Sequence, residues 1–274
     1  MKKMLQLLAL VIFLAACGKT TSVPPTPTED TLTGKLTFAG STTMQPLVGK
    51  LGDAFRVIHP HVSLDIAAGG SVVGIKAIHD GTSDIGMASR ALTSDEAHGI
   101  KQFKVAIDVL AIIVHPDNPV TKLTLAQLED IYMGKITNWQ SLGGPNLQII
   151  PVQRETSSGS RGAFDEMVLQ KQTADAPTLV TSVTAGDEAA SVAGKPGAIG
   201  YVGFGNLDTT TKVIAINGIL PTQQTARDNS YPLVRPLIFM TGPLSQPLAQ
   251  TFIDFALSSQ GQKYIRDLGW VPVK

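Results

Sequence analysis

Three times along this chain, a short apolar stretch is followed by a turn of glycine and hydroxyl residues and then by apolar residues at helical spacing. The three turns are residues 40–43, 69–71 and 154–161. Each pattern predicts a strand, a loop and the beginning of a helix. A chain that alternates strands and helices in this way folds into an α/β structure, in which ligands bind at the carboxyl ends of the strands.

The third turn is the most polar of the three and predicts an anion site. It contains Arg154, Arg161 and three serines just before a helix begins. A helix N-terminus presents unpaired N–H groups and a partial positive charge, which together favour a bound anion. The competing interpretation is that these hydroxyls only cap the helix and that the arginines are solvated.

Composition excludes several classes of function. The 274 residues are 16% charged and carry a formal net charge of zero, so nothing indicates a nucleic-acid binder. The five histidines are scattered and the chain has one cysteine, so their spacing predicts no metal site. The sequence also lacks the Gly-x-Ser-x-Gly elbow of serine hydrolases. We therefore predict a binding protein without cofactor or metal, and not an enzyme.

The N-terminus predicts export and lipid attachment. Residues 1–16 combine two lysines with an apolar run that is too short to span a bilayer comfortably, which is typical of a signal peptide. The segment ends Leu14-Ala15-Ala16-Cys17-Gly18, which resembles the bacterial lipobox. We expect Cys17 to be acylated, for example by palmitate, and to anchor an extracytoplasmic protein to the cell membrane. The alternative for a lone cysteine is a buried thiol.

The remaining chain divides into a tether and two lobes. Residues 17–34 are rich in Thr, Pro and Ser and predict a poorly ordered tether. A break at His115-Pro116-Asp117-Asn118-Pro119 indicates a crossover. The predicted first lobe comprises residues 35–115 and 232–274, and the predicted second lobe comprises residues 116–231.

Three further segments carry specific expectations. Val105 to Val114 is nearly continuously apolar and predicts one central strand. Val213 to Ile216 predicts one short strand, and Thr93 to Glu96 predicts the cap and first turn of a helix.

The motifs together resemble a known family. Gly40-Ser41-Thr42-Thr43, then Gly69-Gly70-Ser71-Val72-Val73-Gly74 with Asp84-Ile85-Gly86-Met87-Ala88-Ser89-Arg90, then the turn from Arg154 to Arg161, are similar in order and spacing to the phosphate-binding proteins of bacterial phosphate ABC transporters, the PstS family. The resemblance covers essentially the whole mature chain. It implies a type II periplasmic-binding-protein fold, in which two α/β lobes joined by two crossovers close over a dehydrated oxyanion in the cleft between them.

The resemblance also implies partners and a ligand set. The partners would be inorganic phosphate and the permease subunits of an ABC transporter, and the protein would be a monomer. One arginine and many neutral donors would replace the water around the anion. The implied phosphate-binding residues are Thr42, Thr43, Ser71, Ser89, Arg90, Arg154, Glu155, Ser158, Gly159 and Ser160.

One position departs from the family pattern. The best-known members place a carboxylate where Arg90 stands, and that carboxylate accepts the proton of hydrogen phosphate and repels sulfate. Glu155 is our candidate for a substitute acceptor, with Asp84 second, although Asp84 is better suited to ordering its turn. The alternative for Glu155 is an ion pair with Arg90 or Arg161.

Other functions remain open at this stage. The protein could bind sulfate or another tetrahedral oxyanion, since only a proton acceptor separates these ligands. A phosphoester hydrolase is a further alternative, as is an adhesion or signalling lipoprotein that only retains the fold.

Overall fold

The computed structural model describes residues 32–273, which belong to one compact unit, Thr31–Lys274. The predicted signal peptide and Cys17 lie outside the described residues, as does the predicted tether except for its last three positions. The first strand begins at Thr33, so the folded chain starts two residues before the predicted position of 35. Within residues 32–273, every helix is too short or too polar to cross a membrane.

The first sheet has six strands and is mixed. Its order is β13-β4-β12-β3-β1-β2. The pairs of β1 with β2 and with β3 are parallel, whereas β12 and β13 pair antiparallel. The strands are β1 (Thr33–Gly40), β2 (His61–Ala67), β3 (Ile85–Ala88), β4 (Lys101–Val109), β12 (Val234–Thr241) and β13 (Val271–Pro272).

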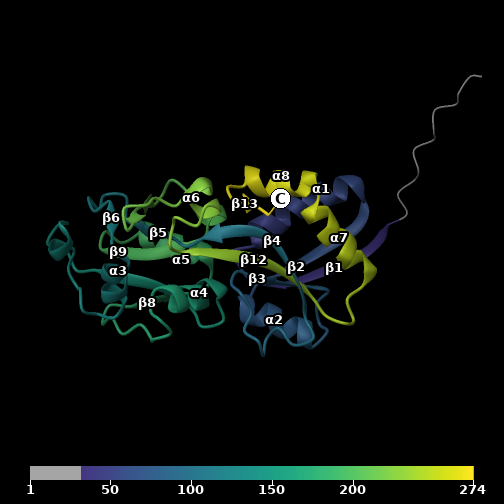
Figure 1. The fold of residues 1–274 in the computed structure, drawn as a ribbon, viewed down its shortest axis with the longest axis horizontal. Helices are drawn as coiled ribbons and strands as arrows, with labels where there is room; N and C mark the ends of the chain where they lie inside the picture. The colour runs from purple at the N-terminus through teal and green to yellow at the C-terminus, as the bar shows by residue number, and fades with distance from the viewer. Residues whose placement is uncertain (1–31, 274) are drawn as a thin grey trace, which may run out of the picture. The chain divides into compact units, whose positions relative to one another are not determined.

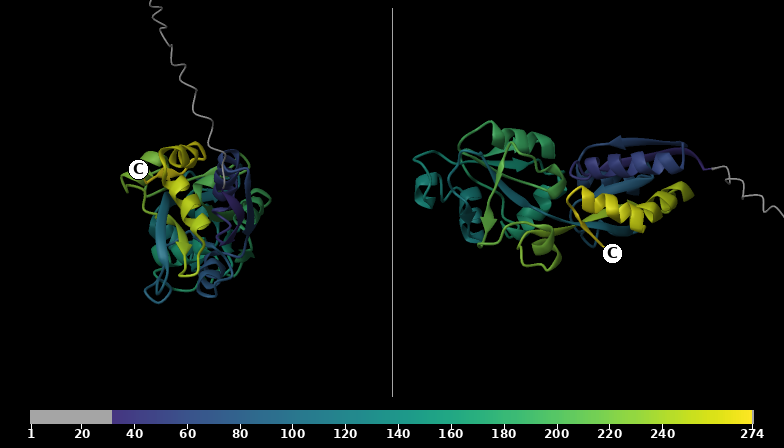
Figure 2. Two further views of the ribbon diagram at one scale, coloured as in Figure 1. Left: turned by 90° about the vertical axis from the view of Figure 1, so that its right-hand side faces the viewer. Right: turned by 90° about the horizontal axis from the view of Figure 1, so that it is seen from above.

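Four helices cover this sheet: α1 (Gln45–Ile58), α2 (Ser71–His79), α7 (Pro247–Leu257) and α8 (Ser259–Asp267). Helices α1, α7 and α8 contact one another, and α2 packs against β1 and β3 on the opposite face (Figure 1). Segments from both ends of the described chain, purple to blue and yellow, therefore share one layered structure (Figure 2).

The second sheet has five strands in the order β10-β5-β9-β7-β8. Strand β7 pairs parallel with β8 and β9, and β5 pairs antiparallel with β9 and β10. These strands are β5 (Ala111–Val114), β7 (Ile150–Arg154), β8 (Val180–Ser182), β9 (Ala198–Val202) and β10 (Lys212–Val213), and a separate parallel pair is formed by β6 (Lys122–Leu123) and β11 (Ala215–Ile216).

The helices between these strands begin at polar caps. They are α3 (Leu125–Tyr132), α4 (Gly159–Met167), α5 (Ala185–Ala193) and α6 (Gln223–Arg227), with 3-10 turns η1 (Trp139–Leu142) and η2 (Phe204–Asn206). Thr124, Thr184 and Thr222 each accept a hydrogen bond from the third residue of the helix, whose side chain bonds back to the threonine N–H. This capping box satisfies two N–H groups that a helix start leaves unpaired.

Each sheet has its own aromatic core. In the first, Phe252 packs edge-on against Phe38 and Phe55. In the second, Phe164 stacks on Tyr201 with ring centroids 4.2 Å apart, and Tyr132 lies against both rings. The two largest of the four apolar clusters among the described residues contain these aromatic groups, one in each sheet's region.

Three predictions about single elements were wrong. The apolar run from Val105 to Val114 is divided at Leu110 into β4 of the first sheet and β5 of the second, so residues 111–114 pair with the second sheet although the predicted first lobe extends to 115. Residues 213–216 are likewise divided between β10 and β11. A strand that is buried on both faces is apolar in either sheet. The apolar pattern therefore does not show where the chain passes from one sheet to the other.

The predicted helix after Thr93 is a series of turns. Thr93 Oγ1 still accepts from the N–H of Glu96, and the Glu96 carboxylate accepts from the N–H of Thr93. The contacts of a helix cap therefore form although no helix follows. The Glu96 carboxylate is also paired with Arg90.

Candidate anion-binding site

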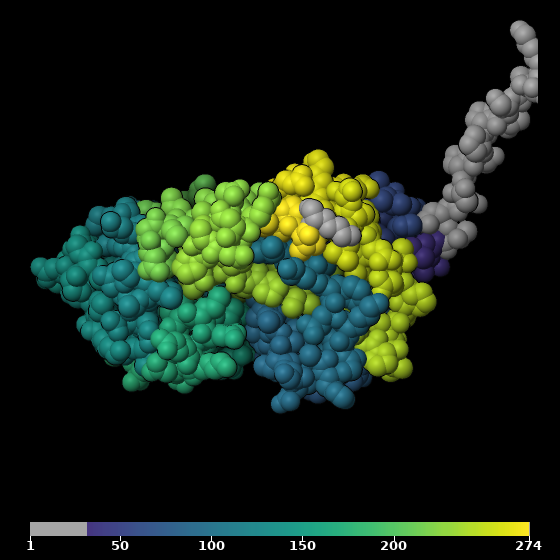
Figure 3. All heavy atoms as spheres, viewed as in Figure 1, coloured from purple at the N-terminus to yellow at the C-terminus, as the bar shows by residue number. Residues whose placement is uncertain are grey.

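The three polar turns meet in the structure. Arg154 Nη2 donates to Thr42 Oγ1 over 3.0 Å, Thr43 Oγ1 lies 3.1 Å from Ser160 Oγ, and the N–H of Val72 donates to Ser157 O over 3.1 Å. The first two turns follow strands of the first sheet, and the third follows β7 of the second. On the face of the molecule that Figure 3 shows, atoms of the first sheet's region and of the second sheet's region pack directly against one another.

Arg154 is the last residue of β7 and is buried with 1% of its surface exposed. Its N–H donates to the hydroxyl oxygen of Tyr201, whose ring is stacked on Phe164. Its Nη2 donates to Thr42 and also to Val183 O over 2.6 Å. The aromatic core thus fixes the backbone of Arg154, and the guanidinium reaches toward the first turn.

A buried acid lies beside this guanidinium. Glu188 Oε2 of α5 is 4.0 Å from Arg154 Nε, and Glu188 Oε1 accepts from the N–H of Tyr201. Burial raises the pKa of Glu188 to about 8, although the charge of Arg154 favours the ionised form. Burial likewise lowers the pKa of Arg154, with Glu188 acting in the opposite direction.

Hydroxyl groups surround the junction of the turns. Ser71 Oγ accepts from the N–H of Ser89, and Ser41 Oγ donates to Ser89 Oγ over 2.9 Å. Ser41, Ser71, Ser89 and Ser160 are all buried. A hydroxyl that accepts a hydrogen bond, as Ser71 does from Ser89, keeps its own proton for an anion.

Two helices begin at this junction. Helix α2 begins at Ser71 and has no side-chain cap, because its cap residue is Gly70. Helix α4 begins at Gly159, and its cap residue Ser158 accepts from the N–H of Arg161. The capping interpretation therefore holds for Ser158, but the N–H groups of Gly159 and Ser160 have no partner within the helix.

Gly159 is required by the close approach of the second and third turns. A Cβ added there would overlap Ser71 Oγ and would lie 2.7 Å from Ser89 Oγ. Any larger residue would push the turns apart, since such short contacts force neighbouring atoms to move.

Arg90 and Glu155 each contact a further side chain of the protein. Both Nη atoms of Arg90 donate to Glu96 over 2.7 Å, which holds the pKa of Glu96 down at about 2. Glu155 Oε1 accepts from Ser157 Oγ over 2.7 Å, and Arg161 pairs with Asp165, so neither ion pair considered for Glu155 forms.

Asp84 orders the start of β3. Its carboxylate accepts from the N–H and the hydroxyl of Thr37, which ties β3 to β1. This contact fits the structural role rather than that of an acceptor for an anion's proton.

Sequence reasoning missed a buried ion pair that touches the site. Arg235 of β12 donates through Nε and Nη2 to Asp108 of β4, and through Nη1 to Ser160 Oγ over 2.7 Å. Asp108 also accepts from the N–H of Phe204. A signal was present, because each charged residue interrupts an apolar strand, where an unpaired charge would be costly.

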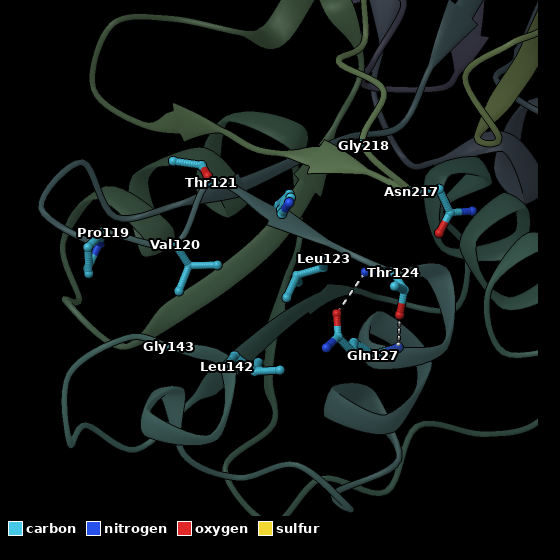
Figure 4. Close-up of a pocket in the computed structure, with 11 residues that line it drawn as sticks. Pro119, Val120, Thr121, Leu123, Thr124, Gln127, Leu142, Gly143, Asn217 and Gly218 are labelled. Carbon is cyan, nitrogen blue, oxygen red and sulfur yellow. Dashed lines mark hydrogen bonds between the residues drawn. The ribbon is translucent and has the colours of Figure 1, made fainter.

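A separate cavity of about 810 Å³ lies away from the turns, between β6 and the segment after η1 (Figure 4). Its polar side chains include Gln127 and Thr124, which are engaged in the cap of α3 through the two hydrogen bonds drawn in Figure 4. None of the predicted anion ligands lines it. Within residues 32–273, no group of three His, Cys, Asp or Glu side chains is placed to hold a metal ion.

The junction of the turns can bind a tetrahedral oxyanion. It combines the buried guanidinium of Arg154, several hydroxyls and two helix N-termini, and groups of these kinds donate to negative oxygen atoms. The buried guanidinium of Arg235 also reaches the site, where it donates to Ser160 Oγ while paired with Asp108. The chemistry that it supports is binding.

Comparisons with known proteins agree with this geometry. A family model described as a PBP superfamily domain matches residues 25–260. The phosphate-binding protein PstS of Bacillus subtilis is 31% identical over 282 residues, which cover 98% of this chain and 93% of that protein.

Two solved structures are similar over nearly the same length. A phosphate-bound protein from Clostridium perfringens, assigned as a phosphate ABC transporter substrate-binding protein, is 36% identical with a TM-score of 0.84, over 88% of this chain and 100% of that one. An ABC-type phosphate transport receptor from Vibrio cholerae is 32% identical with a TM-score of 0.72, over 86% of this chain and 99% of that one.

Proposed function

This chain belongs to the PstS family of phosphate-binding proteins, and from this we propose that it binds inorganic phosphate outside the cytoplasm and delivers it to the permease of an ABC transporter. The type II periplasmic-binding-protein fold predicted from the sequence is confirmed by the same matches. The members of this family are binding proteins rather than enzymes, and we assign no catalytic residue.

The observation that carries the proposal is the contact between Arg154 and Thr42, which are 112 residues apart. It brings a buried guanidinium from the second sheet to the hydroxyl turn of the first. A phosphate ion at this point would meet donors from both sheets, which explains how one anion could hold the two parts together.

We propose that the two sheets are the cores of two lobes that close on phosphate. The chain crosses between them near Leu110 and again near Leu233, whose backbones are joined by a hydrogen bond of 2.9 Å. The remaining proposed ligands are Thr43, Ser71, Ser89, Glu155 and the segment Ser158 to Ser160. The role of Arg90 as a phosphate ligand stays a prediction, and its side chain contacts Glu96 and Ala91.

We further propose that an acyl group on Cys17 anchors the protein to the outer face of the cell membrane after removal of residues 1–16. The lipobox-like residues from Leu14 to Gly18 support this. Mass spectrometry of the protein extracted from bacterial membranes would test it, since an unmodified Cys17 in the mature protein would refute the anchor.

Calorimetric titration with phosphate and with sulfate tests the proposed ligand. We expect saturable binding of phosphate by the purified chain from residue 18 onward, and much weaker binding of sulfate. Equal affinity for the two anions would mean that the site has no proton acceptor. An absence of phosphate binding would refute the proposal, and turnover of phosphate esters would favour the hydrolase alternative.

Glu155→Gln tests the proposed proton acceptor. A glutamine keeps the size of the side chain but cannot serve as a charged acceptor, so the variant should lose preference for phosphate over sulfate while still binding both. Competition calorimetry measures the ratio of the two affinities. Glu166→Gln is the matched control, because Glu166 is exposed on α4; an unchanged ratio in Glu155→Gln would place the acceptor elsewhere.

A further inference from the structure

Glu188 and Arg154 form a buried acid–base pair whose facing atoms are not joined. Glu188 Oε2 and Arg154 Nε are 4.0 Å apart, and each is buried without a hydrogen-bond partner among the described residues. A fully formed arginine–carboxylate pair has hydrogen bonds of about 2.7–2.9 Å. Buried polar atoms that lack a partner are rare, so this pair requires an explanation.

We propose that Glu188 is a positioning residue that acts on the anion through Arg154: a proton on its carboxyl group leaves the guanidinium charge free for an oxyanion, so that proton binding and anion binding favour each other. This deepens the proposed function, on which it rests. A protonated carboxyl group does not compete with the anion for Arg154, whereas an ionised one would neutralise the same guanidinium.

The surroundings of Glu188 favour the protonated form at neutral pH. Arg154 on β7 and Arg235 on β12 favour the ionised carboxylate, but burial outweighs them and raises the pKa to about 8. Tyr201 on β9 and Tyr132 on α3 also lie near, and burial raises the pKa of each phenol. The other described elements that pack against α5, which are β5, β8 and η2, contain no titratable side chain.

The adjacent acid on the same helix is set apart from this pair. Asp187 is exposed, and its carboxylate accepts from the N–H of Thr184 as part of the helix cap. The Asp187 carboxylate is therefore engaged at the helix cap.

Thermodynamic linkage gives the direction of the effect. An oxyanion beside Arg154 adds negative charge near Glu188, so it should raise the pKa of that carboxyl further. When the pH is near or above the pKa that Glu188 has in the free protein, the complex therefore holds more protons than the free protein. The affinity for phosphate then falls as the pH rises through that range. Glutamine cannot titrate, so Glu188→Gln should lack this part of the pH dependence.

The experiment measures phosphate affinity by calorimetry between about pH 7 and about pH 9.5 for the wild type, Glu188→Gln and the exposed control Glu166→Gln. The ratio of dissociation constants, wild type over Glu188→Gln, should rise about fivefold or more across this range. The ionisation of phosphate itself cancels in the ratio. The control should follow the wild type, and circular dichroism verifies that the variants are folded.

A second measurement uses only the wild-type protein. With ¹³C-labelled glutamate carboxyl groups, NMR should find one carboxyl that titrates near pH 8, and phosphate should move its titration to higher pH. Parallel affinity profiles for wild type and Glu188→Gln, or a titration that phosphate leaves unchanged, would overturn the inference. A wild-type protein that does not bind phosphate at pH 7 would refute the proposed function itself.

Discussion

Replacing Arg154 by alanine should weaken phosphate binding by roughly 100-fold or more. Each hydrogen bond from a charged group contributes about 1.5–3 kcal/mol, and a guanidinium can meet two oxygens of one anion. Arg154 also brings a buried positive charge to the junction of the three turns, and its guanidinium, unlike that of Arg235, has no hydrogen bond to a carboxylate among those found in the described residues. Its loss should therefore remove both directional bonds and the charge that balances the anion.

Calorimetry on Arg154→Ala is best interpreted beside Arg56→Ala. Arg56 lies on α1, where it pairs with Asp53 at the surface and has a side chain that is 52% exposed. Its removal should leave phosphate binding unchanged. An Arg154→Ala protein that remains folded and binds within about twofold of the wild type would contradict the assignment of the site.

The parts of this site that the sequence predicts are local. A glycine and hydroxyl turn after a strand and before a helix is encoded within about ten residues, so the turns at 40–43, 69–71 and 154–161 could be found individually. Their meeting could not be derived from spacing alone. The pairing of Thr42 with Arg154 joins residues of different sheets, and the family resemblance, not periodicity, supplied that expectation.

The partners of charged side chains were less predictable. The pairing of the Arg90 guanidinium with Glu96, six residues later, was not predicted, and the contact of Arg90 with the anion stays a prediction. Glu188 follows the cap of a helix in sequence, where an acid usually interacts with the helix N-terminus at the surface. Only the packing of α5 against β9 and β7 turns it inward toward Arg154.

The division of the apolar run at Leu110 explains why Asp108 was overlooked. A nearly continuous apolar run predicts one buried strand, and a single acid within the run does not change that prediction. In the structure, Asp108 stands near the end of β4 and Arg235 near the start of β12, close to both crossings of the chain. Their contacts reach Phe204 and Ser160, which belong to the part of the chain that forms the second sheet.

Asp108→Ala should therefore lower the free energy of unfolding by about 3–5 kcal/mol, since removal of one partner leaves the buried Arg235 charge uncompensated. Both side chains of this pair are at most 1% exposed, and they are joined by bonds of 2.8 and 3.0 Å. Urea denaturation without phosphate measures the effect, because a bound ligand would add its own stabilisation.

Asp53→Ala is the matched control for this prediction, as it breaks an aspartate–arginine pair of which both side chains are exposed. Its cost should stay below about 1 kcal/mol, since water and salt screen such pairs. The double variant with Asp108→Ala and Arg235→Ala should lose less stability than the sum of the two single variants, because no unpaired charge remains. A loss in Asp108→Ala no larger than that in Asp53→Ala would show that the buried pair does not join the two parts of the chain energetically.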